Sequence, residues 1–156
     1  MLGTLSKDKS NRVRSALADN PAAPASVLRS SAGSKGMRKK LAANPATPHD
    51  TMALLAVDPD SHVRIALARN AGAPASVLAK LARVNDRYLR SCVAENKNCD
   101  LPTWRLLAAD VYVRKHVAEN EAAPETILKQ LSSDADEDVR RKVALNRATA
   151  AGPEPS

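Results

Sequence analysis

The chain contains 156 residues with a formal net charge of +7, and its only aromatic residues are one tryptophan and two tyrosines. Such a composition favours closely packed helices over a β-sheet, because the aromatic and β-branched residues that fit strands are sparse. Two cysteines are too few for a disulfide framework or a closed four-ligand metal site. No apolar segment has the length of a signal peptide or the about 20 residues of a membrane span, so we expect a soluble cytoplasmic protein.

One eight-residue frame, Val-Arg-x-x-Val-Ala-x-Asn, recurs six times along the chain. In chain order its copies are VRSALADN (13–20), MRKKLAAN (37–44), VRIALARN (63–70), LRSCVAEN (89–96), VRKHVAEN (113–120) and VRRKVALN (139–146). The asparagines follow one another at spacings of 24, 26, 26, 24 and 26 residues. A fixed period in this range predicts a solenoid, in which each unit buries its apolar side against its neighbours.

Each frame is predicted to form the first helix of a two-helix unit. Four positions before the arginine stands a residue that favours a helix N-cap, namely Ser10, Ser34, Asp60, Asp86, Asp110 or Asp136. The helix is expected to run from there to the asparagine. Asparagine is expected to close it, because this residue tolerates the left-handed conformation used at helix ends.

A second helix is predicted to begin four residues after the asparagine. Proline, which suits a first helical turn, stands there as Pro24, Pro48, Pro74 or Pro124. In the fourth unit Asp100 replaces the proline and Pro102 follows, so a different cap is expected. The inward residues are Val27, Leu28, Met52, Leu55, Val77, Leu78, Leu81, Trp104, Leu107, Ile127, Leu128 and Leu131. We expect one solenoid domain over residues 1–148 and a disordered tail rich in Pro, Ala and Gly over 149–156.

The combined frame, continued as Asn-x-x-x-Pro-x-x-x-Leu-x-x-Leu, resembles the leucine-rich repeat variant family over nearly the whole chain. The resemblance implies an all-α, right-handed superhelix of paired short helices, one of them often 3₁₀, related in architecture to HEAT and armadillo superhelices. It implies scaffolding or recognition more than any reaction. Relatives can carry a cysteine-rich iron–sulfur segment, but nothing in this sequence matches it, so no cofactor is expected.

The repeated arginine lies inside the apolar arc when the first helix is projected on a wheel. Its stem is therefore expected to pack on the core while its head bonds to loop carbonyls, a cap aspartate or a repeat asparagine. The six predicted structural pins are Arg14, Arg38, Arg64, Arg90, Arg114 and Arg140. A ladder of guanidinium groups along a phosphate backbone is the alternative, and it would need these heads to reach solvent.

The positions flanking the arginine differ between units, and together they predict a surface strip with basic ends and an aromatic middle. Its residues are Arg12, Lys39, Lys40, His62, Tyr88, Tyr112, Lys115, His116, Arg141 and Lys142. We expect this strip to bind a protein or peptide with an acidic surface. A nucleic-acid strand is the alternative partner, and a solvated face without a ligand is the plainest reading because acidic residues are interspersed along the chain.

Catalytic and metal-binding patterns are weak in this sequence. Cys92 and His116 occupy one column of adjacent units, but stacked helices lie about 8 to 10 Å apart and the two side chains should point outward in parallel. Zinc needs converging ligands. Cys99 is expected to be a small buried residue. The sequence has no glycine-rich phosphate loop or nucleophile elbow. A DNA glycosylase built from helical repeats would need an aromatic pocket for an extruded base, but the lone tryptophan stands in a core column. We therefore predict a protein without a metal site or enzymatic activity.

Overall fold

The computed structural model describes residues 11–151, and side chains from residue 15 to residue 149. Within this range the chain forms helices and no strands. The first helices of the units are α2 (Asn11–Asp19), α4 (Arg38–Ala43), α6 (Ser61–Ala68), α8 (Arg87–Ala94), α10 (Arg114–Glu119) and α12 (Glu137–Ala151). The second helices are α3 (Ala25–Ser31), α5 (His49–Leu55), α7 (Ala75–Leu81), α9 (Leu101–Ala109) and α11 (Glu125–Leu131). The predicted all-helical solenoid of two-helix units is confirmed.

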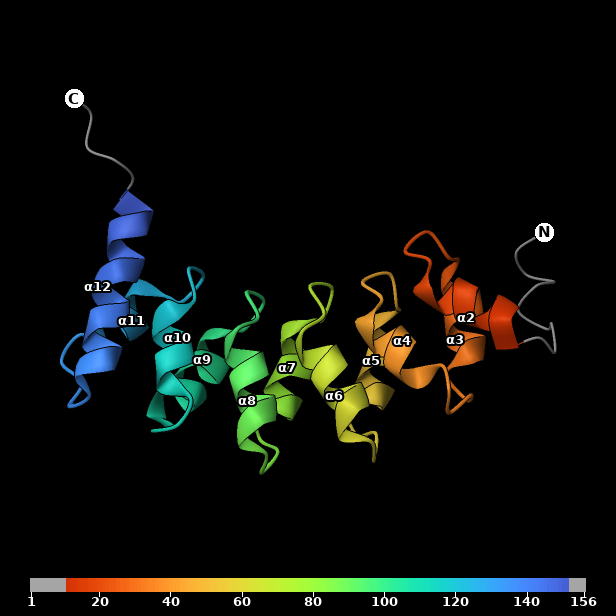
Figure 1. Ribbon diagram of the computed structural model, residues 1–156, viewed down its shortest axis with the longest axis horizontal. Coiled ribbons are helices and arrows are strands. Elements are labelled where there is room, and N and C mark those ends of the chain that lie inside the picture. Colours follow the sequence, from red (N-terminus) through yellow and green to blue (C-terminus); the bar gives the residue numbers. More distant parts are fainter. Residues whose placement is uncertain (1–10, 152–156) are drawn as a thin grey trace.

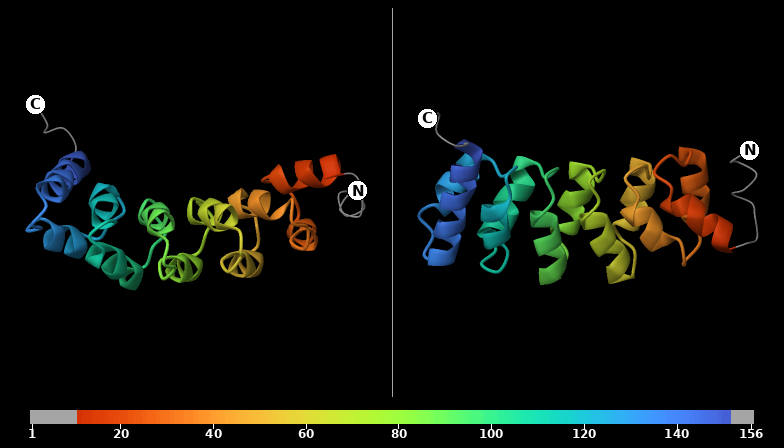
Figure 2. Two further views of the ribbon diagram at one scale, coloured as in Figure 1. Left: turned by 60° about the horizontal axis from the view of Figure 1, so that its bottom comes forward. Right: turned by 45° about the horizontal axis from the view of Figure 1, so that its top comes forward.

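The two kinds of helix form two parallel rows along an elongated array (Figure 1). Successive first helices contact one another directly, whereas successive second helices touch less. In the left view of Figure 2, the array is a shallow arc with the first helices on its inner side. The sequence left open which helix row is concave, and the closer packing of the first helices places them on the concave side.

The core lies between the two rows. Every second-helix residue predicted to point inward is buried, and Trp104 of α9 is the largest of them. From the first helices, Leu41, Leu67 and Val93 are fully buried against this layer. Full burial of one such aliphatic side chain contributes roughly 1.5–3 kcal/mol, so the periodic core accounts for the stacking of units that would be unstable alone.

Aspartate caps begin several of the first helices, as predicted. The Asp60 side chain accepts the backbone N–H of His62 at 2.9 Å, and the Asp86 side chain accepts that of Leu89 at 3.0 Å. The unusual second helix α9 is capped by Asp100, whose side chain accepts the N–H of Thr103 at 2.9 Å. Side-chain capping thus replaces the usual proline in the fourth unit.

The helix boundaries differ from the predicted ones in three places. Helices α4 and α10 begin later than expected, at Arg38 and Arg114, because a turn precedes each of them and no side chain caps their first residue. The repeat asparagine is not left-handed, since Asn44 has φ −80° and ψ 118°. Helix α12 continues through Asn146 to Ala151, so residues 149–151 are helical rather than part of a disordered tail. Ser10 and residues 152–156 lie outside the described residues.

Candidate interaction surface

The repeat asparagines connect neighbouring units by buried hydrogen bonds. The Asn44 side-chain amide donates to the carbonyls of Ala18 and Asn20 at 2.8 and 3.0 Å, and Asn70 donates likewise to Ala42 and Asn44. Asn96, Asn120 and Asn146 continue the series. The Oδ1 atom also accepts a backbone N–H two residues later in its own loop at Asn20, Asn44, Asn70, Asn96 and Asn120. The asparagine therefore closes its own turn and holds the preceding unit.

The repeat arginines bond to protein groups near the core. The Arg90 Nε atom donates to the Asp110 carboxylate at 2.8 Å, and its Nη1 atom donates to the Val84 carbonyl at 2.9 Å. Equivalent ion pairs join Arg38 to Asp58 at 2.7 Å and Arg114 to Asp134 at 3.0 Å. The Arg38 Nε–H has no aligned acceptor, so its contact with Asp58 is an ion pair rather than a directed hydrogen bond.

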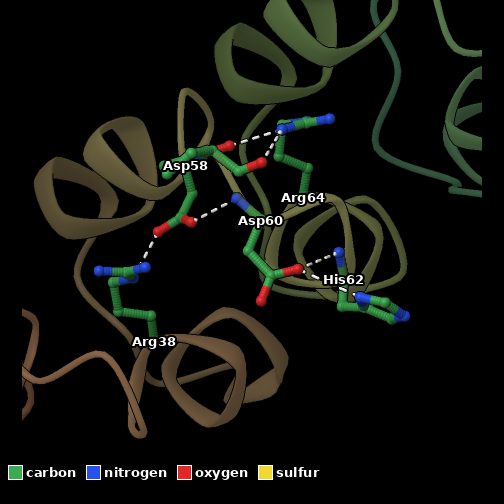
Figure 3. A network of polar contacts seen from close by, with 6 residues as sticks. Arg38, Asp58, Asp60, His62 and Arg64 are labelled. Carbon is green, nitrogen blue, oxygen red and sulfur yellow. Dashed lines mark hydrogen bonds and ion pairs between the residues drawn. The ribbon is translucent and has the colours of Figure 1, made fainter.

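The other two described arginines have no such carboxylate partner. They donate hydrogen bonds to the carbonyls of nearby loops instead. Arg64 donates to the carbonyls of Asp58 and Pro59, and Arg140 donates to those of Asp134 and Ala135. Figure 3 shows the local network, in which the buried Asp58 carboxylate also accepts the Asp60 N–H at 2.9 Å. These hydrogen bonds occupy guanidinium donors. The same donors would have to be free if the arginines formed a ladder along a phosphate backbone. The Arg14 side chain lies outside the described residues.

All described residues of the predicted strip lie on first helices or on the turns that precede them. Tyr88 and Tyr112 are exposed, and so are Lys39, His62, Lys115 and Arg141, whereas Lys40, His116 and Lys142 are half-buried. The Arg12 side chain lies outside the described residues. The strip thus follows the inner side of the arc, although the structure shows that it is not a run of unpaired cations.

Carboxylates alternate with the cations of the strip. The residue before the repeat asparagine pairs with the residue two positions after the arginine in the next unit. Lys40 pairs with Asp19 in this way, and Lys142 pairs with Glu119. The His116 Nδ1 atom lies 3.6 Å from Glu95. Burial lowers the pKa of His116, and the nearby Glu95 opposes this effect only in part.

The strip predicted from the sequence omits the column that supplies these carboxylates. It is the variable position of Ala-x-Asn, and it contains Asp19, Ala43, Arg69, Glu95, Glu119 and Leu145. On a helical wheel this position adjoins the columns that the strip includes. The column was therefore visible in the alignment of the repeats. A strip that included it would have predicted that charges pair between neighbouring units.

Each exposed tyrosine contacts an arginine. Arg69, which the predicted strip also omits, donates to the Tyr88 hydroxyl at 2.8 Å, and its guanidinium carbon lies 5.5 Å from the ring centroid. The guanidinium carbon of Arg87 lies 3.4 Å from the centroid of the Tyr112 ring. Cation–π contacts at exposed sites contribute about 0.5–1 kcal/mol, so these pairs fix the positions of side chains that would otherwise move freely.

Grooves separate successive first helices on the inner face. One, here called the central groove, has a volume of about 540 Å³ and is lined by Lys39, His62, Ile65, Ala66, Arg69 and Tyr88. The next groove, of about 580 Å³, is lined by Arg69, Ala71, Cys92, Glu95, Asn96, Lys97 and Asn98. A third groove toward the C-terminus is lined by Glu95, Lys97, Glu119, Asn120 and Glu121. The inner face therefore changes from cationic in the central groove to acidic further along.

The structure places Cys92 in the core and Cys99 at its edge. Cys92 is buried, at 1% exposure, rather than pointing outward as predicted, because helix α6 of the preceding unit packs beside α8. Cys99 is half-buried and its Sγ atom donates to the Val93 carbonyl. Burial raises the pKa of both thiols, that of Cys99 to about 12. Among the described residues, no group of three His, Cys, Asp or Glu side chains is arranged to hold a metal ion.

No helix in the described part of the chain combines the length and the apolar composition needed to cross a bilayer.

No family model and no curated protein matches this sequence. In structure the chain is similar to a solved protein described as a leucine-rich repeat variant with a novel repetitive protein structural motif. The TM-score is 0.60 at 23% sequence identity, and the similarity covers 99% of this chain and 65% of that protein. The resemblance predicted from the repeat frame is thus confirmed for the fold, and the chain spans less than two thirds of the length of that protein.

Proposed function

We propose that the protein is a non-enzymatic recognition module whose inner face binds an acidic peptide segment of another protein. A solenoid presents an extended concave surface, and its variable positions sit on a constant scaffold. The observation that carries the proposal is the central groove, which is lined by Lys39, His62, Arg69 and an exposed tyrosine and by no carboxylate. A peptide lying along the first helices would meet cations, apolar walls and hydrogen-bonding groups in turn.

A nucleic-acid strand fits this face less well. A phosphate backbone carries one negative charge per nucleotide and is bound by a continuous series of cations. On the inner face Asp19 and Glu119 each pair with a lysine and neutralise it, and the Glu95 carboxylate lies beside His116. A polyanion crossing the face would therefore meet carboxylates at regular intervals, whereas a peptide can place neutral or basic residues opposite them.

Panning the immobilised protein against a phage-displayed library of random dodecapeptides tests the proposal. We expect the enriched peptides to contain more Asp and Glu than the unselected library. The alternative is tested in parallel by fluorescence anisotropy with labelled random-sequence single- and double-stranded DNA across a salt series. An absence of peptide enrichment, together with DNA binding whose affinity falls steeply with salt, would overturn the proposal in favour of a nucleic-acid partner.

A further inference from the structure

We propose that the central groove binds the carboxylate of one aspartate or glutamate side chain of the acidic peptide, together with the apolar residue beside it. This inference rests on the proposed function and names one subsite of the same face. The groove lies where α4, α6 and α8 meet, with Lys39 on α4, Ile65 and Ala66 on α6, and Tyr88 on α8.

The pairing of charges between units is interrupted at this groove. On either side of it, Asp19 pairs with Lys40 and Glu119 pairs with Lys142. The equivalent positions beside the groove are Ala43 with Ala66, and Arg69 with Cys92. The internal carboxylate is therefore replaced by a methyl group in one unit and by a cation in the next.

Lys39 and Arg69 consequently lack the carboxylate that neutralises their counterparts, whereas the third basic side chain of the groove, His62, has its Nδ1 atom 3.1 Å from the Asp60 carboxylate. Within the described part of the chain, Lys39 and Arg69 form no ion pair with an aspartate or glutamate. The two neighbouring grooves each include at least one acidic side chain. A carboxylate of the bound peptide takes the place of the internal carboxylate that pairs with a lysine in other units.

Arg69 is already oriented for such a ligand. Its Nη2 atom donates to the Tyr88 hydroxyl at 2.8 Å, and the guanidinium lies 5.5 Å from the centre of the Tyr88 ring. A guanidinium has five N–H donors and matches the geometry of a carboxylate, so most donors remain for the ligand. A side chain held in place before binding loses less conformational entropy when the ligand arrives.

The apolar walls of the central groove determine which residue of the peptide can lie next to its carboxylate. Ile65 and Ala66 are half-buried, and the Tyr88 side chain is 56% exposed. Apolar surface of this kind is removed from water when an aliphatic side chain covers it. Beyond Arg69 the neighbouring groove contains Glu95 and Lys97, so the ligand is a peptide with an acidic residue beside an aliphatic one and without a long acidic run.

The test uses the full chain and a synthetic peptide carrying the sequence that the dodecapeptide library enriches most. Its affinity is measured by isothermal titration calorimetry for the wild type and for the Lys39→Glu and Arg69→Glu variants. Lys80→Glu is the matched control, since Lys80 is an exposed lysine on α7, in the outer row of helices and outside the strip. Lys39→Gln and Arg69→Gln serve as milder substitutions, and melting temperatures verify that each variant is folded.

We expect Lys39→Glu and Arg69→Glu each to weaken binding by about tenfold or more, and Lys80→Glu to change it by less than about twofold. Replacing the acidic residue of the peptide by its amide should remove most of the difference between wild type and variants. Acidic peptides that bind all three charge-reversed variants equally well would overturn the subsite and leave the proposed function standing. Failure of the library to enrich acidic peptides would overturn both.

Discussion

The side-chain amide of Asn70 donates to the main-chain carbonyl of Asn44 at 3.0 Å, and the same nitrogen donates to the Ala42 carbonyl at 2.7 Å. Its Oδ1 atom accepts the N–H of Gly72 at 2.8 Å. A carboxamide has two N–H donors and an acceptor oxygen, and no other side chain of this size satisfies all three bonds. The unit boundaries at Asn44, Asn70 and Asn96 all present the same two carbonyls and the same N–H, which explains why the asparagine recurs.

Replacing this asparagine should therefore destabilise the array. Asn70→Asp keeps the shape but turns the donor into a carboxylate oxygen that faces two carbonyls at a site only 3% exposed. We expect a loss of roughly 2–4 kcal/mol in the free energy of unfolding by urea. Asn85→Asp, at an exposed position, is the control and should stay within about 0.5 kcal/mol of the wild type. Equal effects of the two substitutions would contradict the structural role of Asn70.

The repeat arginines should differ in their contribution according to their partners. Arg90→Ala leaves the partly buried Asp110 carboxylate and the Val84 carbonyl without their donor, so we expect a loss of about 2–3 kcal/mol. Arg140→Ala removes bonds to two exposed carbonyls and should cost less than about 1 kcal/mol. Urea unfolding of both variants gives the comparison. A larger loss for Arg140→Ala would show that the carboxylate contact is not what stabilises the stack.

The close approach of two loops predicts that Gly72 cannot carry a side chain. A Cβ atom there would lie 2.5 Å from the Pro45 carbonyl oxygen of the preceding unit. Gly72→Ala should lower the stability by about 1–3 kcal/mol, because backbone must shift to accommodate it. Gly36→Ala is the control, since nothing lies within 4 Å of its added Cβ. A thermal melt in which both variants match the wild type would contradict the packing of these loops.

The half-buried His116 should make stability depend on pH. Burial lowers its pKa in the folded protein below the ordinary value of 6.5, so the unfolded chain takes up the proton first as the pH falls. The contribution of His116 to stability is complete above the pKa that it has in the unfolded chain. It is lost as the pH falls toward the lower pKa that it has in the folded protein. Between about pH 7.5 and about pH 5.5 the wild type should therefore lose more stability than His116→Gln, measured by urea unfolding. Parallel curves for the two proteins would show that His116 does not contribute.

The sequence was sufficient to predict the fold but not the contacts between units. Arg, Ala and Asn at a constant spacing identified the units, and the aliphatic positions of the second helices proved to be buried. The role of Asn44 was predicted wrongly because spacing along the chain does not show that a side chain reaches the preceding unit. Cys92 points away from the core of its own unit on a helical wheel, yet a neighbouring helix covers it.

The surface strip illustrates the same limit. Lys40 and Lys142 were predicted from their columns to belong to the basic ends of a binding strip, and the structure shows that each meets a carboxylate of the preceding unit. The column that contains Asp19, Arg69 and Glu119 was visible in the alignment. Which columns adjoin across a unit boundary depends on the rotation of one unit relative to the next, and this rotation is a property of packing rather than of a single frame.

The most direct measurement of the central claim is a titration of the ¹⁵N-labelled protein with the enriched acidic peptide, followed by amide chemical shifts. We expect the largest changes on the inner face, at residues of α4, α6 and α8 around Lys39, Ala66 and Arg69, with little change on α5 and α7. Changes confined to the second helices on the outer side of the arc would contradict the account, because they would place the binding surface on the opposite face of the solenoid.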